Sequence, residues 1–217
     1  MKKINLYIIG TGNHAKVVFS EVCKIKKISF KGFINNLSLN AEIFQLDNYL
    51  KFKSIHKIIN IKKLILNSHF VVAIGKNNLR KKIVLGLRKK FKNIKWAKVI
   101  STESIIDKTV MIDEGSIIIS GSTINIGSKV GKHSVINTNC SIDHDNLIGD
   151  YVDCSPGVTS AGNVVIRDGV FVGMGSSIKQ NITINSNTII GAHSFVNKNC
   201  AKDSTYYGVP IKKNENF

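Results

Sequence analysis

The chain of 217 residues contains no apolar run near 18 residues, so we expect no helix that spans a membrane. It also contains no CxxC pair, although it has four cysteines, Cys23, Cys140, Cys154 and Cys200. We interpret them as free thiols in a reducing cytoplasm, with Cys140, Cys154 and Cys200 buried. A structural zinc site is the minor alternative, and we expect no metal.

Acidic residues are scarce in the first part of the chain. Residues 1–97 contain 21 Lys and Arg but only three acids, whereas residues 98–217 contain ten Lys and Arg and eleven acids. A nucleic-acid-binding domain is one interpretation of such a charge. However, the lysines are scattered through periodic segments, and no nucleic-acid motif accompanies them. We favour a solvated basic surface without a nucleic-acid partner, which would attract anionic substrates such as nucleotide sugars and coenzyme A.

A period of six organises the rest of the chain. From residue 100 to residue 196 every sixth residue is Ile or Val, apart from Cys154 and Ser160, which are small. A second series of mostly small or β-branched residues stands two positions earlier. The aliphatic series is Ile100, Ile106, Ile112, Ile118, Ile124, Val130, Ile136, Ile142, Ile148, Ile166, Val172, Ile178, Ile184, Ile190 and Val196. The second series, which we call the corner series, is Ser104, Val110, Ser116, Ser122, Ser128, Ser134, Cys140, Val152, Val158, Val164, Val170 and Ser176.

Neither a helix, with a period of 3.6, nor an ordinary strand, with a period of 2, produces this pattern. Hexapeptide periodicity is the sign of a parallel β-helix, in which three hexads close a triangular coil of eighteen residues. The aliphatic residue of each hexad points inward, the small residue fits the corner, and Gly or Asn supplies the turn. We therefore predict a β-helix domain over residues 98–217, including a C-terminal tail.

Residues 1–97 alternate between strand and helix patterns, which indicates a small Rossmann-like domain. We expect strands at 4–9, 30–34 and 70–74 and helices at about 14–25 and 77–90, with short candidates around 45–50 and 55–66. The turn Gly10-x-Gly12 could hold a diphosphate at a helix N-terminus. Because it lacks the third Gly of GxGxxG, and because no acid ends the second strand, we do not expect a dehydrogenase.

Three histidines lie in the repeat. His144 is flanked by Asp143 and Asp145, and a carboxylate beside an imidazole raises the basicity that a general base needs. A surface histidine with a chance acidic neighbour is the alternative interpretation. His133 and His193 have no flanking acid, and we expect both at the surface.

Five stretches together resemble a bacterial family of sugar acyltransferases. They are IIGTGNHAKVV (8–18), FVVAIGKNNLRKKI (70–83), INTNCSIDHDNLIG (136–149), VTSAGNVVI (158–166) and YGVPIKK (207–213). The family comprises sialic acid O-acetyltransferases and the UDP-4-amino-sugar N-acetyltransferases of bacillosamine synthesis. The resemblance covers almost the whole chain and implies a left-handed β-helix and a homotrimer.

The resemblance also implies roles for residues of the repeat. His144 would be the general base and Asp145 would raise its basicity, while Asn137 matches an asparagine near the family's active site. The backbone of Gly162 would help to hold the oxyanion, a task that backbone N–H groups perform well.

Acetyl-CoA, the implied co-substrate, would lie along the β-helix between adjacent subunits. Met174 and Ala192 would line its tunnel together with Gly162. Asp153 stands where a family member has a histidine at the CoA site, so the resemblance places Asp153 there although its side chain differs.

The N-terminal domain would hold the nucleotide sugar. Gly12, Asn13 and His14 would meet its diphosphate or ribose, and Gly75 would allow its close approach. Asn35 and Asn36 replace an acidic pair of the bacillosamine-type enzymes. Because of this departure, the resemblance does not decide whether the nucleotide is UDP, dTDP or GDP.

We therefore expect direct acetyl transfer to the 4-amino group of a nucleotide-linked 4-amino-4,6-dideoxy sugar, for surface glycan synthesis. Cys140 and Cys154 could suggest an acyl-cysteine route, but packing explains their positions. A sialic acid O-acetyltransferase and a non-catalytic sugar-nucleotide-binding scaffold are the alternatives.

Overall fold

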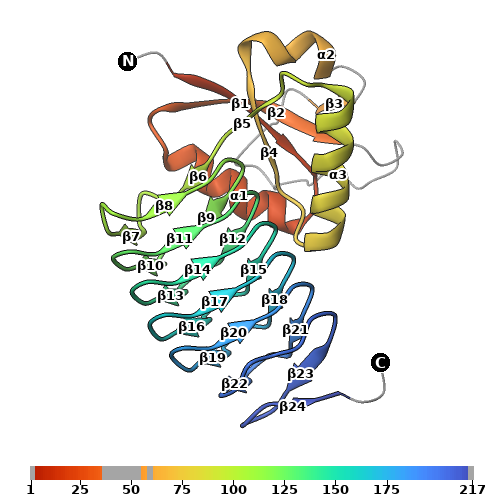
Figure 1. Cartoon of the computed structure of the whole chain (residues 1–217). Coiled ribbons are helices and arrows are strands. Elements are labelled where there is room, and N and C mark those ends of the chain that lie inside the picture. Colours follow the sequence, from red (N-terminus) through yellow and green to blue (C-terminus); the bar gives the residue numbers. More distant parts are fainter. Residues whose placement is uncertain (1–2, 36–54, 58–60, 215–217) are drawn as a thin grey trace. The chain divides into compact units, whose positions relative to one another are not determined.

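The computed structural model describes residues 3–35, 55–57 and 61–214, without the side chains of Asn35, of residues 55–57, and of Ile61 and Lys63. Asn36 and the candidate element at 45–50 lie outside these residues. The chain forms two compact units, residues 1–99 and 100–217, drawn in Figure 1. No helix within the described ranges has both the length and the apolar character needed to cross a membrane.

The first unit is built on a parallel sheet of five strands in the order β3-β2-β1-β4-β5. Its strands are β1 (Ile4–Ile9), β2 (Ile28–Asn35), β3 (Ile55–Lys57), β4 (His69–Val72) and β5 (Lys95–Trp96), and its helical segments are α1 (Asn13–Lys24), α2 (Ile61–Leu64), η2 (Ile65–Asn67) and α3 (Asn77–Lys90). The predicted helix at 77–90 is confirmed, and the one expected at 14–25 begins and ends one residue earlier. The second strand begins before residue 30 because Ile28 and Ser29 pair with Ile4 and Asn5 of β1.

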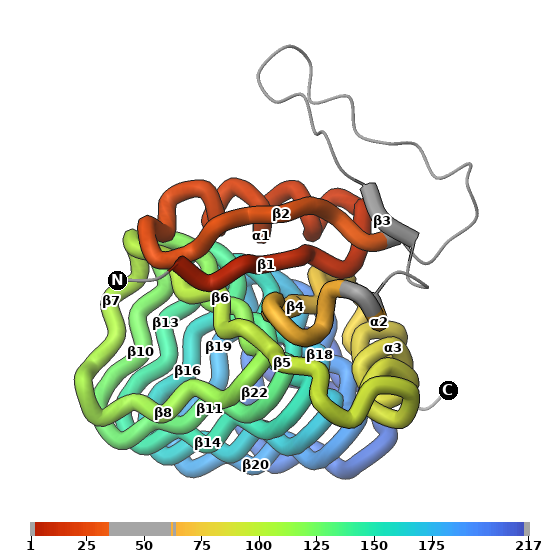
Figure 2. Tube along the Cα trace, turned by 90° about the horizontal axis from the view of Figure 1, so that it is seen from above, coloured from red at the N-terminus to blue at the C-terminus, as the bar shows by residue number. Residues whose placement is uncertain are grey.

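The strand order reverses between β1 and β4. The crossover β1-α1-β2 moves toward one edge of the sheet, whereas β4-α3-β5 moves toward the other. Since such crossovers are right-handed, α1 and α3 cover opposite faces of the sheet. In Figure 2, α1 runs along β1 and β2, and α3 lies on the β4 side. The carboxyl ends of β1 and β4 thus form a topological switch point, where open α/β sheets bind ligands.

The second unit is the predicted β-helix, and its coils number about six. Three parallel sheets form its faces. Sheet I contains β6 (Val99–Ile100), β9 (Ile117–Ile118), β12 (Val135–Ile136), β15 (Asp153–Cys154), β18 (Phe171–Val172), β21 (Ile189–Ile190), β23 (Thr205–Tyr207) and β24 (Lys212–Lys213). Sheet II contains β7 (Ile105–Ile106), β10 (Thr123–Ile124), β13 (Ser141–Ile142), β16 (Thr159–Ser160), β19 (Ser177–Ile178) and β22 (Phe195–Val196). Sheet III contains β8 (Met111–Ile112), β11 (Lys129–Val130), β14 (Leu147–Ile148), β17 (Val165–Ile166) and β20 (Thr183–Ile184).

The predicted aliphatic series forms the core of this unit. Residues eighteen apart pair between coils, as Ile124 does with Ile142, and the series is buried from Ile112 onward. The corner series is also buried from Ser116 onward, and five of its serines donate a hydrogen bond to the carbonyl fifteen residues later. These bonds run from Ser116, Ser122, Ser128, Ser134 and Ser176 to the carbonyls of Gly131, Asn137, Asp143, Gly149 and Gly191.

An antiparallel hairpin ends the β-helix. β24 pairs antiparallel with β23, whereas the other strand pairs of the three sheets are parallel. Tyr206 and Ile211 bury their side chains in the core beneath the hairpin, while Lys212 and Lys213 are exposed. Unlike the coils before it, the last segment therefore has a polar outer strand.

Candidate functional site

His144 lies at the corner between sheets II and III, two residues after β13. The side chain of Asp143 accepts the His144 backbone N–H at 2.8 Å, which fixes the start of the turn. Asp145 completes the turn in the left-handed region, at φ = 56°. One oxygen of its carboxylate lies 2.9 Å from His144 Nδ1. An ionised carboxylate can only accept a hydrogen bond, so Nδ1 carries the proton and neutral His144 keeps its lone pair on Nε2.

The hydrogen bond to Asp145 raises the pKa of His144, and the nearby charges of Asp143 and Asp145 act in the same direction. Partial desolvation opposes them. The side chains of His144 and Asp145 are 47% and 58% exposed in the single chain. The predicted pair is therefore in contact, and it presents a basic nitrogen at the surface of the coil.

Gly162 lies one coil further along, directly beneath the His144 imidazole. A Cβ on Gly162 would overlap the ring, and the nearest ring atom is Nε2. The neighbouring N–H groups of Ala161 and Asn163 donate to carbonyls of adjacent coils. Among the described residues, no hydrogen bond uses the N–H of Gly162. A general base and a backbone donor thus lie side by side, which is the arrangement that acyl transfer requires.

Asn137, Met174 and Ala192 lie at a different corner, between sheets I and II. Met174 and Ala192 are eighteen residues apart, both are exposed, and Met174 is 54% exposed. The Asn137 side chain caps its own turn, accepting the Thr138 N–H at 2.9 Å. Within one chain, β13 separates this corner from His144. Asp153 lies in β15 and is only 5% exposed.

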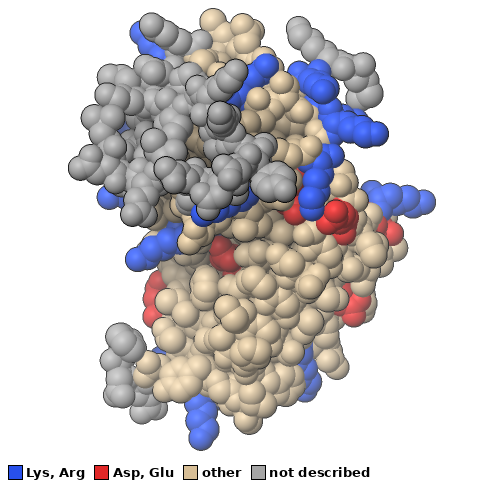
Figure 3. All heavy atoms as spheres, turned by 180° about the vertical axis from the view of Figure 1, so that it is seen from behind, with Lys and Arg blue, Asp and Glu red and all other residues tan. Residues whose placement is uncertain are grey.

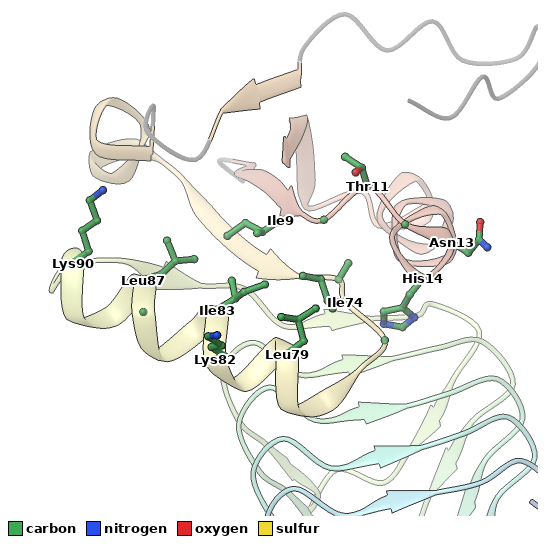
Figure 4. A pocket seen from close by; sticks show the side chains of 15 residues that line it. Ile9, Thr11, Asn13, His14, Ile74, Leu79, Lys82, Ile83, Leu87 and Lys90 are labelled. Carbon is green, nitrogen blue, oxygen red and sulfur yellow. The ribbon is translucent and has the colours of Figure 1, made fainter. Parts of the chain in front are cut away.

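A cavity of about 690 Å³ occupies the switch point of the first unit. Figure 4 shows Leu79, Ile83 and Leu87 projecting from α3 toward the sheet, opposite Ile9. The predicted residues Gly12, Asn13, His14 and Gly75 all line this cavity. The complete lining is Ile9, Gly10, Thr11, Gly12, Asn13, His14, Ala73, Ile74, Gly75, Leu79, Lys82, Ile83, Gly86, Leu87 and Lys90.

Two helix N-termini border this cavity. α1 begins at Asn13 and α3 at Asn77, and neither has an acid in its first turn or a side-chain cap. Such termini attract anions. Lys82 and Lys90 add positive charge to the lining, and Figure 3 shows many basic side chains over this unit. Gly10 permits the tight turn, because its φ is 120° and a Cβ there would lie 2.8 Å from the Ala73 carbonyl oxygen.

His14 is neutral at physiological pH. Burial, together with the positive charge of Arg80, lowers the pKa of His14 to about 4. Its Nε2 is buried and makes no hydrogen bond with any described residue. His14 therefore adds no positive charge to the cavity lining.

Two supporting residues were not predicted. Arg80, fully buried, donates from Nη1 to the carbonyls of Ile74 and Gly75 at 2.8 and 3.3 Å and so holds the turn after β4. Asn146 is fully buried beneath the His144 turn. The sequence signal for Asn146 was present, because an amide interrupts the small or β-branched corner series at that position.

The prediction of a surface His133 is wrong. His133 is fully buried, and its ring stacks on Tyr151 one coil later, with centroids 5.5 Å apart. His193 is exposed, as expected. Cys140, Cys154 and Cys200 are buried, and burial raises the pKa of all three thiols, to about 11 for Cys140. Nucleophilic thiolates are thus disfavoured at these positions. Within the described ranges, no cluster of His, Cys, Asp and Glu is arranged to hold a metal ion.

Comparisons with known proteins agree with both units. Residues 5–87 match the PglD N-terminal domain, and residues 163–198 match the bacterial transferase hexapeptide (six repeats). A GDP-perosamine N-acetyltransferase of Escherichia coli O157:H7 is 28% identical over 132 residues. This match spans 61% of the chain but only 58% of that relative.

Solved structures match along nearly the whole chain. PerB from Caulobacter crescentus, solved with CoA and GDP-perosamine, has a TM-score of 0.82 and 26% identity, covering 97% of both chains. The acetyltransferase domain of PglB from Neisseria gonorrhoeae FA1090 has a TM-score of 0.81 and 22% identity, covering 96% of this chain and 98% of that one. The first unit is thus similar to the PglD N-terminal domain, the second to bacterial transferase hexapeptide repeats, and the whole chain to solved sugar N-acetyltransferases.

Proposed function

We propose that the chain is an acetyl-CoA-dependent N-acetyltransferase that acts on the 4-amino group of a nucleotide-linked 4-amino-4,6-dideoxy sugar. The observation that carries the proposal is the His144–Asp145 pair over Gly162. A base next to an available backbone donor suits the attack of an amine on a thioester. Both the N-acetyltransferase relative and the structures solved with CoA support this reaction.

In the proposed reaction, His144 Nε2 takes a proton from the sugar amine while the amine nitrogen attacks the thioester carbonyl. The oxygen that becomes negative accepts a hydrogen bond from the Gly162 N–H. The tetrahedral intermediate then collapses: the C–S bond breaks, the amide remains on the sugar, and the proton passes to the CoA sulfur. Asp145 stabilises the imidazolium that forms between these steps. No acyl-cysteine is involved.

Acetyl-CoA fits the corner between sheets I and II. Met174 and Ala192 form an exposed, mostly apolar column along the coil axis, suited to the pantetheine arm. When bound, acetyl-CoA supplies the activated acetyl group. We propose no ionic role for Asp153, because its carboxylate is buried.

The proposed site needs more than one copy of the chain. Its predicted residues occupy two corners on opposite sides of sheet II: His144 and Gly162 lie at one corner, and Asn137 and Met174 at the other. Copies arranged around a three-fold axis would bring one kind of corner against the other. We therefore propose a homotrimer, and sedimentation equilibrium of the whole chain tests it. A monomer that is fully active would contradict this assembly.

The first acceptor to test is GDP-perosamine, because it appears in the names of the relatives. The cavity at the switch point offers a diphosphate two helix N-termini together with Lys82 and Lys90, whereas His14 is neutral and adds no charge. Asn35 and Asn36 stay predictions for the nucleoside. We place the reaction in the cytoplasm, consistent with the free cysteines, and in the synthesis of a surface glycan.

The deciding experiment measures thiol release from acetyl-CoA with four acceptors in parallel: GDP-perosamine, the UDP- and dTDP-linked 4-amino-4,6-dideoxy sugars, and free sialic acid. Release with one nucleotide sugar, with the acetamide identified by mass spectrometry, is the expected result. Release with sialic acid alone would assign the chain to the O-acetyltransferases. If none of the four acceptors causes thiol release, the proposal is overturned and a binding scaffold is favoured.

A further inference from the structure

Asn146 occupies a position that Ser, Val, Cys, Ile or Thr occupies in the other coils. It belongs to the corner series that points into the β-helix, between Ser128 and Val164. Its side chain is fully buried. An amide at such a position costs free energy unless its polar atoms find partners. Its Oδ1 has no partner among the described residues, so the contacts of Nδ2 identify what the side chain does.

The Asn146 amide joins two neighbouring turns. Its Nδ2 donates to the carbonyls of Asp143 and His144 in its own turn, at 2.8 and 3.2 Å. It also donates to the carbonyl of Ala161 in the next coil, at 3.0 Å. Only the last bond repeats the fifteen-residue pattern of the corner serines. Asn146 therefore ties the turn that carries His144 to the turn that carries Gly162.

The bond to Ala161 also sets the direction of the Gly162 N–H. A trans peptide is planar, with its C=O and N–H pointing in opposite directions. The Ala161 carbonyl points inward to Asn146, so the Gly162 N–H of the same peptide points outward, on the side of the coil where the His144 ring lies. The direction of this donor thus depends on a side chain inside the coil.

We propose that Asn146 is a positioning residue for acetyl transfer: it holds the Gly162 N–H outward and keeps the His144 turn in register with it. The inference rests on the proposed function, since it assigns the reaction's oxyanion donor to Gly162. Asn146 itself does not touch the substrate. Its effect is on turnover rather than on acetyl-CoA binding, because the CoA column lies at the other corner.

Three variants test this role. Asn146→Val copies Val152, Val158 and Val164 at the same register, so the coil accommodates its shape, but it donates nothing. Asn146→Ser restores a donor to the Ala161 carbonyl, as Ser134 does for Gly149. Ser134→Val is the matched control, because it removes the same kind of bond at the corner between sheets III and I, away from His144.

We expect Asn146→Val to lower kcat by about 10- to 100-fold, somewhat less than loss of an oxyanion donor itself, with the KM for acetyl-CoA changed by less than about threefold. Asn146→Ser should recover most of the rate, and Ser134→Val should stay within about twofold of wild type. The role is overturned if Asn146→Val keeps the wild-type kcat, if Ser134→Val loses as much, or if Ser is no better than Val. Should Asn146→Val fail to fold, Asn146→Ala, which also removes the Nδ2 donor but adds no branched side chain, takes its place.

Crystal structures of the Val and Ser variants separate this inference from the proposed function. If the wild-type chain acetylates none of the acceptors, the function fails, but the peptide geometry still answers the question. The Ala161–Gly162 peptide is expected to turn in the Val variant and to keep its orientation in the Ser variant. An unchanged peptide in both variants would overturn the positioning role.

Discussion

The Nε2 and Cε1 atoms of the His144 imidazole lie against the position where Gly162 lacks a side chain, eighteen residues and one coil further along. This contact exists because the β-helix places residues eighteen apart above one another. A base in one hexad can therefore act with a backbone donor in another, although the two are distant in sequence. Because the ring lies so close, even the methyl group of an alanine at position 162 would meet the His144 imidazole.

Gly162→Ala should lower kcat by about 10- to 100-fold, because a methyl group would push the His144 ring out of place. The backbone N–H remains, so the loss reports on the imidazole. A double-mutant cycle with His144→Ala checks this explanation: in the His144→Ala background, Gly162→Ala should cost almost nothing further. Full additivity would show that the two residues act independently.

His144→Ala should lower kcat by roughly 10²–10⁴-fold while acetyl-CoA still binds, since a general base contributes about that much. Steady-state kinetics measure the first effect, and calorimetric titration with CoA measures the second. His69→Ala is the matched control. His69 is the first residue of β4, so it lies at the amino-terminal ends of the strands, whereas the switch point lies at their carboxyl ends. A His144→Ala enzyme with wild-type turnover would remove His144 from the mechanism.

The pH profile should follow the pKa of His144, which the hydrogen bond that Asp145 accepts from Nδ1 raises above the ordinary histidine value. Catalysis needs the unprotonated imidazole, so kcat should rise as pH increases through this pKa and then level off. Asp145→Asn removes the carboxylate charge and lowers the pKa of His144. The rising limb should therefore move to lower pH, with a lower plateau.

Asn suits this substitution because Asn139 and Asn163 already adopt the same left-handed conformation in equivalent turns. The turn should therefore survive, and the shift can be assigned to charge. A profile of Asp145→Asn that coincides with the wild-type profile would show that another group controls the limb.

Ile166→Asp should unfold the β-helix, because Ile166 is 1% exposed and stacks between Ile148 and Ile184. A buried, unpaired carboxylate costs several kcal/mol (about 3–5), a large share of the stability of a typical domain. Val165→Asp is the control, since the neighbouring side chain of the same strand faces outward and is partly exposed. Circular dichroism during heating compares the two. A folded Ile166→Asp protein would contradict the inward direction of the aliphatic series.

The fold could be predicted because the hexapeptide period fixes which side chains face inward. Ile124, Ile142 and Ile166 occupy the hexad position whose side chain points into the coil, and all three are buried. Strand ends were harder, because pairing decides them: β2 starts at Ile28 only because β1 provides a partner. His133 was misjudged because a residue in a turn is usually exposed, whereas this turn folds its ring beneath Tyr151.

The candidate site was predictable where charge or glycine marks it. The His144–Asp145 contact was expected because the two residues are neighbours in the sequence, whereas Gly162 was expected only through the family resemblance. Asn146 was missed because a neutral amide signals no titration, and its importance depends on three carbonyls that come together only in the folded coil. The separation of Asn137 from His144 follows from sheet geometry, which sequence spacing alone does not reveal.

The hairpin of β23 and β24 has a consequence for polymerisation. A stack of parallel coils ends in unpaired backbone groups, which could template a further chain and grow a fibre. Here the last strand runs in reverse and presents Lys212 and Lys213 at the edge, so another coil would meet mismatched hydrogen bonds and repelling charges. The same segment that closes the core thus disfavours edge-to-edge pairing at this end of sheet I.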